Sequence, residues 1–236
     1  MKTYIWTLPT RIFHWLLAIG FIVAFILGDF DNLKNLHFAF GAFVGSLVFF
    51  RLLFGIFGPK YSNFKDFPLG ISHLKEFVVM FFKDPKVYAG HNPLASVIML
   101  LILIVGLLCS ISGYLTYSAE NNLFTGINED FIEEAHEVLA NLFLILVVIH
   151  LIGVLFDSLC HYYVRTAKSM LTGYKNIDAK DAKLNIFHKA FIILWLTVPF
   201  YLFYAAYGLQ TESKDIHKKS KKHEYYEDFK YEDHDD

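Results

Sequence analysis

Two histidines lie near the ends of one long apolar segment, at residues 133–150. His136 and His150 are fourteen residues apart. In an α-helix, with about 100° and 1.5 Å per residue, that step returns to within about 40° of the same face and rises by about 21 Å. A strongly polar side chain inside a membrane usually faces a bundle interior or a bound group. These imidazoles are therefore candidate ligands of two stacked metal centres.

Two further histidines begin other apolar segments. His14 lies in the first turn of residues 12–28, and His37 opens residues 37–57. If successive segments cross a membrane in alternating directions, depth pairs His14 with His150 and His37 with His136. Bis-histidine ligation of two b-type haems in a helix bundle needs this arrangement, with imidazoles facing each other at two levels. We therefore expect two non-covalent haems b, with their irons about 20 Å apart.

Other interpretations of these residues stay open at this point. A single histidine at a helix end is more often an interfacial residue than a ligand, but four that pair by depth favour haem. Gly41 and Gly45 follow His37 on one helix face, where they could serve helix packing or let a flat macrocycle lie close. Arg51 could extend its side chain to the interface or pair with a haem propionate.

Composition predicts an all-α integral membrane protein. Of 236 residues, 55% are apolar and 18% aromatic, and five segments are long enough to span a hydrocarbon core. We expect a four-helix haem-binding bundle with an additional fifth transmembrane helix. The two cysteines lie in no C-x-x-C-H motif, which excludes covalent c-type haem attachment. Lipid is the expected surrounding, and no nucleic-acid partner is expected. The predicted spans are residues 12–28, 37–57, 94–117, 133–156 and 186–209.

The distribution of positive charge predicts the orientation. With a cytoplasmic N-terminus, almost all lysines and arginines before the tail fall on the cytoplasmic side, and only Lys34 falls on the other. The positive-inside rule favours that orientation. No small-residue cleavage site follows Leu27, so we expect the first segment to be retained as a span.

The chain divides into three predicted regions. Residues 1–176 form the membrane dihaem domain. Residues 177–210 form a connector and the additional transmembrane helix. Residues 211–236 are rich in lysine and acidic residues and are expected to be a disordered tail.

Seven short motifs resemble those of the bacterial cytochrome b561 family, which includes the b-type cytochrome subunit of nickel-iron hydrogenases. The resemblance covers about residues 4–175. One position departs from the family pattern, because Tyr162 and Tyr163 follow His161 where an acidic residue and an amide usually stand. The matching motifs are Leu8-Pro-Thr-Arg-Ile-Phe-His-Trp15, His37 with Gly41, Phe50-Arg-Leu-Leu-Phe-Gly-Ile-Phe-Gly-Pro59, Gly90-His-Asn-Pro-Leu94, Glu134-Ala-His-Glu137, His150-Leu-Ile-Gly-Val154, and Ser158-Leu-Cys-His161 through Ser169-Met-Leu-Thr-Gly173.

The resemblance implies a membrane b-type cytochrome of the bacterial inner membrane. It implies that the four paired histidines are axial ligands of two haems b. It also implies electron exchange between the quinone pool and a redox partner such as a cytochrome c or hydrogenase subunits, as a subunit rather than as a self-contained enzyme. Candidate contacts for a propionate or a quinone are Arg11, Arg51 and His91.

Two alternative functions use the same scaffold. The first is a self-contained quinone oxidoreductase that reacts with superoxide or another external acceptor. The second is a haem-free permease or membrane anchor in which the histidines relay protons. The sequence offers no dedicated substrate pocket to support the first alternative. Against the second, the first four spans carry no Asp, Glu or Lys near mid-depth.

Overall fold

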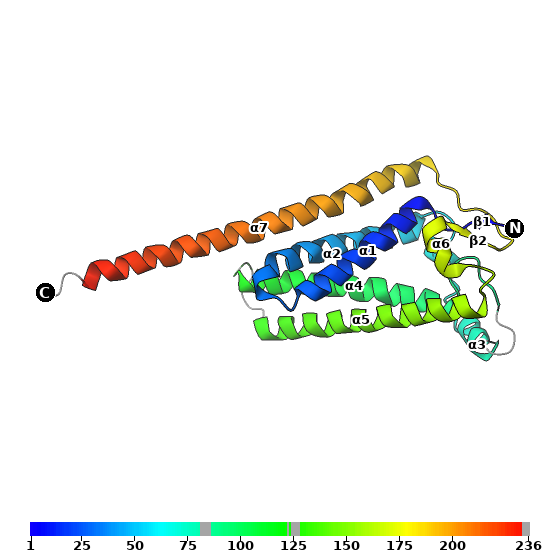
Figure 1. The fold of residues 1–236 in the computed structure, drawn as a ribbon, viewed down its shortest axis with the longest axis horizontal. Coiled ribbons are helices and arrows are strands. Elements are labelled where there is room, and N and C mark those ends of the chain that lie inside the picture. Colours follow the sequence, from blue (N-terminus) through cyan, green and yellow to red (C-terminus); the bar gives the residue numbers. More distant parts are fainter. Residues whose placement is uncertain (81–85, 122, 124–127, 233–236) are drawn as a thin grey trace.

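Five long helices form the body of the protein in a computed structural model (Figure 1). It describes residues 1–80, 86–121, 123 and 128–232, and the side chains of these as far as Leu209. The long helices are α1 (Leu8–Leu27), α2 (Lys34–Phe57), α4 (Pro93–Glu120), α5 (Glu129–Cys160) and α7 (Ile186–Glu232). The shorter elements are β1 (Thr3–Tyr4), α3 (Ile71–Met80), α6 (Thr166–Thr172), β2 (Tyr174–Lys175) and the 3₁₀ turns Asp31–Leu33 and Phe64–Asp66.

Each long helix contains a stretch that is long and apolar enough to cross a membrane. In α7 this stretch is Ile186–Leu209, so the predicted fifth span is present as an apolar helix. The helices expose many large apolar side chains, and along the 32 residues of α5 only Phe143 and Leu146 are buried. Such outward-facing apolar surface suits lipid. The prediction of an all-α membrane bundle is confirmed.

Local sequence signals set where two of these helices begin. The Asn92 side chain accepts a hydrogen bond from the Ala95 backbone N–H at 2.8 Å, and Pro93 follows as the first residue of α4. The Asn128 side chain caps α5 in the same way through the Phe131 backbone N–H, at 3.1 Å. Both arrangements satisfy a donor that the first helical turn leaves without an intrahelical partner.

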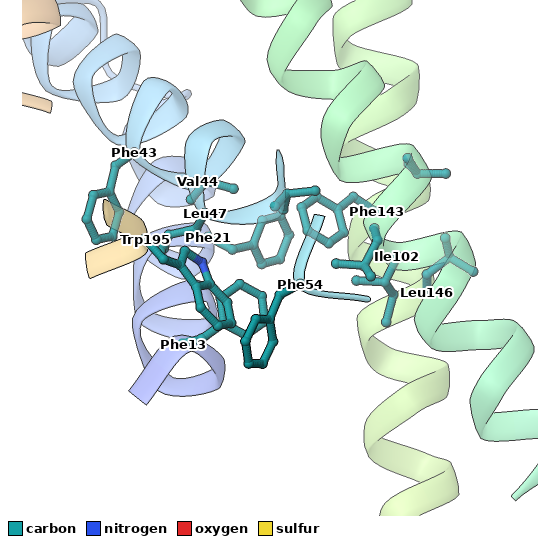
Figure 2. Close-up of a cluster of buried hydrophobic side chains, with 13 residues drawn as sticks. Phe13, Phe21, Phe43, Val44, Leu47, Phe54, Ile102, Phe143, Leu146 and Trp195 are labelled. Carbon is teal, nitrogen blue, oxygen red and sulfur yellow. The ribbon is translucent and has the colours of Figure 1, made fainter. Parts of the chain in front are cut away.

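Helix α2 lies at the centre of the bundle and packs against α1, α4 and α7, while α4 also packs along α5 (Figure 1). Figure 2 shows the apolar core around it, where Phe21 from α1 and Phe143 from α5 meet with ring centroids 4.3 Å apart. Helices α2 and α4 approach closely at Gly45, where a Cβ would come within 2.6 Å of the Ser110 Cβ. At this position glycine serves helix packing.

Helix α7 covers one side of α2. Trp195 of α7 is fully buried against Phe13 and Phe54 (Figure 2), and the Phe191 ring stacks on Phe54 at 5.9 Å. His188 bonds through Nε2 to the Phe57 carbonyl at 2.9 Å. These contacts attach the fifth span to the four-helix core.

The last part of α7 differs from the expected tail. Its backbone is helical through Glu232, whereas the composition predicted disorder over 211–236. Lysine and glutamate have high helix propensity, and neither glycine nor proline follows Gly208. The helix begun in the apolar segment can therefore continue into charged sequence.

One end of the bundle is closed by chain segments that are far apart in sequence. Strands β1 and β2 pair antiparallel, with Thr3 opposite Lys175. Trp6 donates through Nε1 to the Ser169 hydroxyl of α6 at 3.0 Å, and the Ala182 backbone N–H donates to the Tyr4 carbonyl at 2.8 Å. We call β1, β2 and α6, with residues 5–6, 59–67, 88–92 and 176–182, the collar.

Candidate functional site

His14 and His150 face each other at the collar end of the bundle. They come from α1 and α5, and their ring centroids are 6.5 Å apart with an angle of 54° between the ring planes. A metal bonded at about 2 Å to one nitrogen of each ring would hold the two centroids roughly 6 Å apart. The spacing therefore suits one metal held between two imidazoles.

His37 and His136 form the second pair, at the opposite end. They come from α2 and α5, with ring centroids 5.9 Å apart and planes at 87°. The structure thus brings together both pairs that helix depth predicted. Their role as ligands stays a prediction, but each pair has the spacing that such a role requires.

Hydrogen bonds orient the second pair. Nδ1 of His37 lies 2.8 Å from the Ala24 carbonyl, and Nδ1 of His136 lies 3.0 Å from the Cys109 carbonyl and 3.0 Å from the Ser112 hydroxyl. A carbonyl only accepts, so Nδ1 of each ring must be the donor and Nε2 keeps its lone pair. Metal-ligating histidines are commonly fixed in this way.

Glycines leave open space beside two of the histidines. Gly41 follows His37 by one helical turn, and Gly153 follows His150 by nearly one turn. A Cβ added at either glycine would meet no atom within 4 Å. At Gly41, which the sequence left open between packing and cofactor, the structure gives no packing contact for a Cβ, in contrast to Gly45. Space for a flat group is therefore available against the backbone at Gly41.

Gly113 of α4 makes room for the His136 ring. A Cβ at Gly113 would lie 2.9 Å from Cε1 and 3.3 Å from Nδ1 of His136. The Gly113→Val substitution is therefore expected to displace the imidazole, break its bond to Cys109 and remove most of one haem signal, measured as haem per chain by absorption spectroscopy. Gly208→Val is the matched control, because that Cβ would meet nothing within 4 Å. An unchanged haem content in Gly113→Val would contradict this account of His136.

Each histidine pair offers a metal only two protein ligands, which is fewer than a metal ion normally binds. Within the described residues, no three His, Cys, Asp or Glu side chains gather into a possible metal site. The pairs therefore fit a metal whose other ligands come from a bound group. Haem iron meets this condition, because the haem ring would supply the other ligands and the two imidazoles of a pair would hold the iron.

Two buried side chains, Arg51 and Lys175, and the half-buried His91 lie close to one another near the His14 and His150 pair. Arg51 and Lys175 are each only 3% exposed, and Arg51 lies over the Phe64 ring at 5.4 Å from its centroid. The His91 ring lies between those of Trp6 and Phe67, with centroids 4.9 and 4.8 Å away. We call Arg51, His91 and Lys175 the buried cationic cluster.

Two side chains of the buried cationic cluster have a nitrogen without a hydrogen-bond partner in the part of the chain that the structure describes. Nη1 of Arg51 and Nδ1 of His91 have no hydrogen-bond partner among the described residues. Lys175 donates to the backbone carbonyls of Tyr88 and Gly90, at 3.3 and 3.1 Å. Buried charges are normally paired, so the cluster can accept an anion such as a haem propionate. Because protein encloses Arg51, its side chain does not extend to the interface.

Burial lowers the pKa values of the two members of the cluster that lie outside the membrane spans, Lys175 and His91. Burial lowers the pKa of Lys175 to about 8, and nearby Asp157 offsets part of that effect. Burial, followed by the charges of Arg51 and Lys175, lowers the pKa of His91 well below its ordinary value. His91 is therefore neutral at physiological pH, and a nearby anion would favour the charged form of Lys175.

Arg11, also a candidate contact for a propionate or a quinone, lies outside the buried cationic cluster, and that role stays a prediction. Arg11 donates through Nη1 to the Leu171 carbonyl of α6 and lines a groove on α1. Lys175 was not a predicted site residue, because its place in the cluster depends on the pairing of β1 with β2. The alternation of charge and burial in a two-residue strand is too short a signal to have found it.

Other histidines have different surroundings. His161 is buried and contacts the Asp157 carboxylate at 3.1 Å, and His188 contacts the Phe57 carbonyl. His73 is exposed on α3. His161 and His188 thus contact a carboxylate and a backbone carbonyl, which are ordinary structural contacts and differ from the facing imidazoles of the two pairs.

Comparison with known proteins gives one family and one distant relative. The family described as prokaryotic cytochrome b561 matches residues 5–173. A protein of Bradyrhizobium diazoefficiens named "Probable Ni/Fe-hydrogenase B-type cytochrome subunit" is 27% identical over an alignment that covers 41% of this chain and 49% of that protein. The chain thus spans about half the length of this curated relative. The search of solved structures found no match.

Proposed function

Because the chain belongs to the prokaryotic cytochrome b561 family, we propose that it carries electrons through two bis-histidine haems between membrane quinone and a redox partner protein. A membrane b-type cytochrome that acts in electron transfer is the function that family membership itself supports.

The observation that carries the proposal is the presence of two imidazole pairs at the two ends of one helix. Both pairs take one member from α5, at His136 and His150, about 21 Å apart along the helix. When bound, each haem would supply one-electron redox chemistry. The protein would fix the four imidazoles, exclude water with apolar helices and offer the buried cationic cluster to a propionate.

Each histidine pair and the residues near it would serve one of the two haems. His14 and His150 would hold the haem near the collar, with Arg51, His91 and Lys175 as propionate contacts. His37 and His136 would hold the other haem, with their Nδ1 atoms fixed by Ala24 and Cys109. With the N-terminus in the cytoplasm, as the distribution of lysine and arginine favours, the first haem is the inner one and the second is the outer one.

The redox partner is proposed from chemistry and from the relative. The relative is named a probable hydrogenase cytochrome subunit, so hydrogenase subunits are one candidate partner. A small cytochrome c is the other, because it also exchanges single electrons. Either partner would make this chain an electron-transfer subunit rather than a self-contained enzyme.

Spectroscopy of the purified full-length protein tests the proposal. We expect two haems b per chain by pyridine haemochrome assay and two low-spin bis-imidazole signals by electron paramagnetic resonance. In lipid nanodiscs, a quinol should reduce both haems, while steady turnover with an external acceptor should require an added partner. One haem or none per chain would contradict the dihaem proposal, and rapid turnover without a partner would favour a self-contained oxidoreductase.

A further inference from the structure

A groove lies on the outer side of α1, next to α6. It has a volume of about 340 Å³ and is lined mainly by apolar side chains, among them Ile12, Leu16 and Ile19 of α1 and Met170 of α6. Arg11 and Trp15 also line it. The groove is lined by none of the four paired histidines, although the ring of Trp15 contacts that of His14 with centroids 5.2 Å apart. The identity of its occupant does not rest on the proposed electron-transfer function.

The polar groups of the groove are concentrated near the collar. Arg11 is half-buried and donates through Nη1 to the Leu171 carbonyl, and its buried Nε–H has no acceptor among the described residues. Trp15 directs its Nε1–H to the Met170 carbonyl, at 3.4 Å. The guanidinium is therefore the polar group with donor capacity left for a ligand, and a guanidinium is well suited to a phosphate.

An apolar stripe continues from this polar end along α1. Ile12, Ile19, Ile22 and Ile26 follow one another at helical spacing, and they are 36%, 57%, 54% and 54% exposed. The fifteen-residue step from Arg11 to Ile26 covers about 22 Å. This exceeds the roughly 15 Å depth of one leaflet's hydrocarbon region. The stripe can thus accommodate a full acyl chain below a phosphate at Arg11.

We propose that this groove binds one anionic phospholipid, with its phosphate at Arg11 and an acyl chain along the isoleucine stripe. The charge of Arg11 and the apolar stripe match the two parts of such a lipid in the correct order. A neutral quinone fits less well, because the other polar group, the Trp15 N–H, already points to Met170. The bound lipid would join α1 to α6, since Arg11 bridges these two helices.

Native mass spectrometry of the delipidated full-length protein tests the proposal, with palmitoyl-oleoyl phosphatidylglycerol and the matching phosphatidylcholine offered in equal amounts. The wild type is expected to retain one phosphatidylglycerol with roughly tenfold preference, the effect of one charge-assisted contact. Arg11→Gln should reduce this preference to near unity, and Arg11→Lys should keep part of it. Lys60→Gln, which removes an exposed cation outside the groove, should keep all of it.

A second variant, Ile12→Trp, tests the proposal independently in case Arg11→Gln does not fold. Ile12→Trp leaves Arg11 in place but fills part of the groove, so it should also lower retention of the lipid, with an unchanged absorption spectrum as the check of the fold. Equal retention of both lipids by the wild type would overturn the proposal. So would full phosphatidylglycerol preference in Arg11→Gln, or displacement of the lipid by an equimolar neutral quinone.

Discussion

Replacing His136 by alanine is expected to reduce the haem content from two per chain to about one. The lost signal should be that of the outer haem, because the substitution removes one imidazole of the His37 and His136 pair and leaves His14 beside His150. The measurement is a pyridine haemochrome assay combined with low-temperature absorption spectra. His73→Ala is the matched control, because His73 is exposed on α3.

The assignment of partners can be tested by combining substitutions. If His37 and His136 share one iron, His37→Ala should reproduce the loss seen in His136→Ala, and the double variant should lose no more haem than either single one. His14→Ala and His150→Ala should show the same behaviour for the inner haem. Such non-additivity is the signature of residues that act on one centre. Loss of both haems in the His37 and His136 double variant, with one lost in each single variant, would contradict the pairing.

Replacing Arg51 by glutamine is expected to lower the midpoint potential of the inner haem by roughly 90 mV. Two unit charges about 8 Å apart at an effective dielectric constant of about 20 interact by about 2 kcal/mol, and 1.4 kcal/mol corresponds to about 59 mV for one electron. A buried positive charge favours the reduced state, because reduction lowers the positive charge of the centre. Arg51 is buried and Nη1 lacks a protein partner, so its charge is poorly screened.

Redox titration measures the midpoint potentials of both haems in the same protein, so the outer haem serves as an internal reference for the inner one. In Arg51→Gln the outer haem should keep its potential, and Arg51→Lys should restore most of the inner potential because it keeps the charge. In the wild type, the outer haem should have the lower potential, since Glu133, Glu134 and Glu137 lie near His136 and the cationic cluster lies at the other end. An unchanged inner potential in Arg51→Gln would show that this charge is compensated.

The histidine pairs were predictable because they depend on local periodicity. The rise and rotation of an α-helix fix the separation of His136 and His150, and alternating spans fix the depth of His14 and His37. The sequence could not decide between two uses of Gly41, or between burial and extension of Arg51. These depend on which neighbouring helix lies opposite, and helical periodicity alone does not choose the neighbour.

Two other features depended on contacts between distant parts of the chain. Trp195 of α7 is buried against Phe13 and Phe54, although the apolar pattern of Ile186–Leu209 is compatible with lipid on all sides. Lys175 enters the buried cationic cluster through pairing with Thr3. Disorder of residues 211–236 was predicted from their low hydrophobicity. Their backbone is helical through Glu232, because residues with high helix propensity continue an existing helix.

The pairing of Thr3 with Lys175 also has a consequence for biosynthesis. The ribosome makes the N-terminal strand first, but its partner follows only after α1, α2, α4 and α5 have been synthesised. The first strand must therefore remain unpaired while four hydrophobic segments enter the membrane. Contacts between residues this distant in sequence form late, since a long loop must close before they contribute. We therefore expect Lys175 to join Arg51 and His91 late in the maturation of the nascent protein.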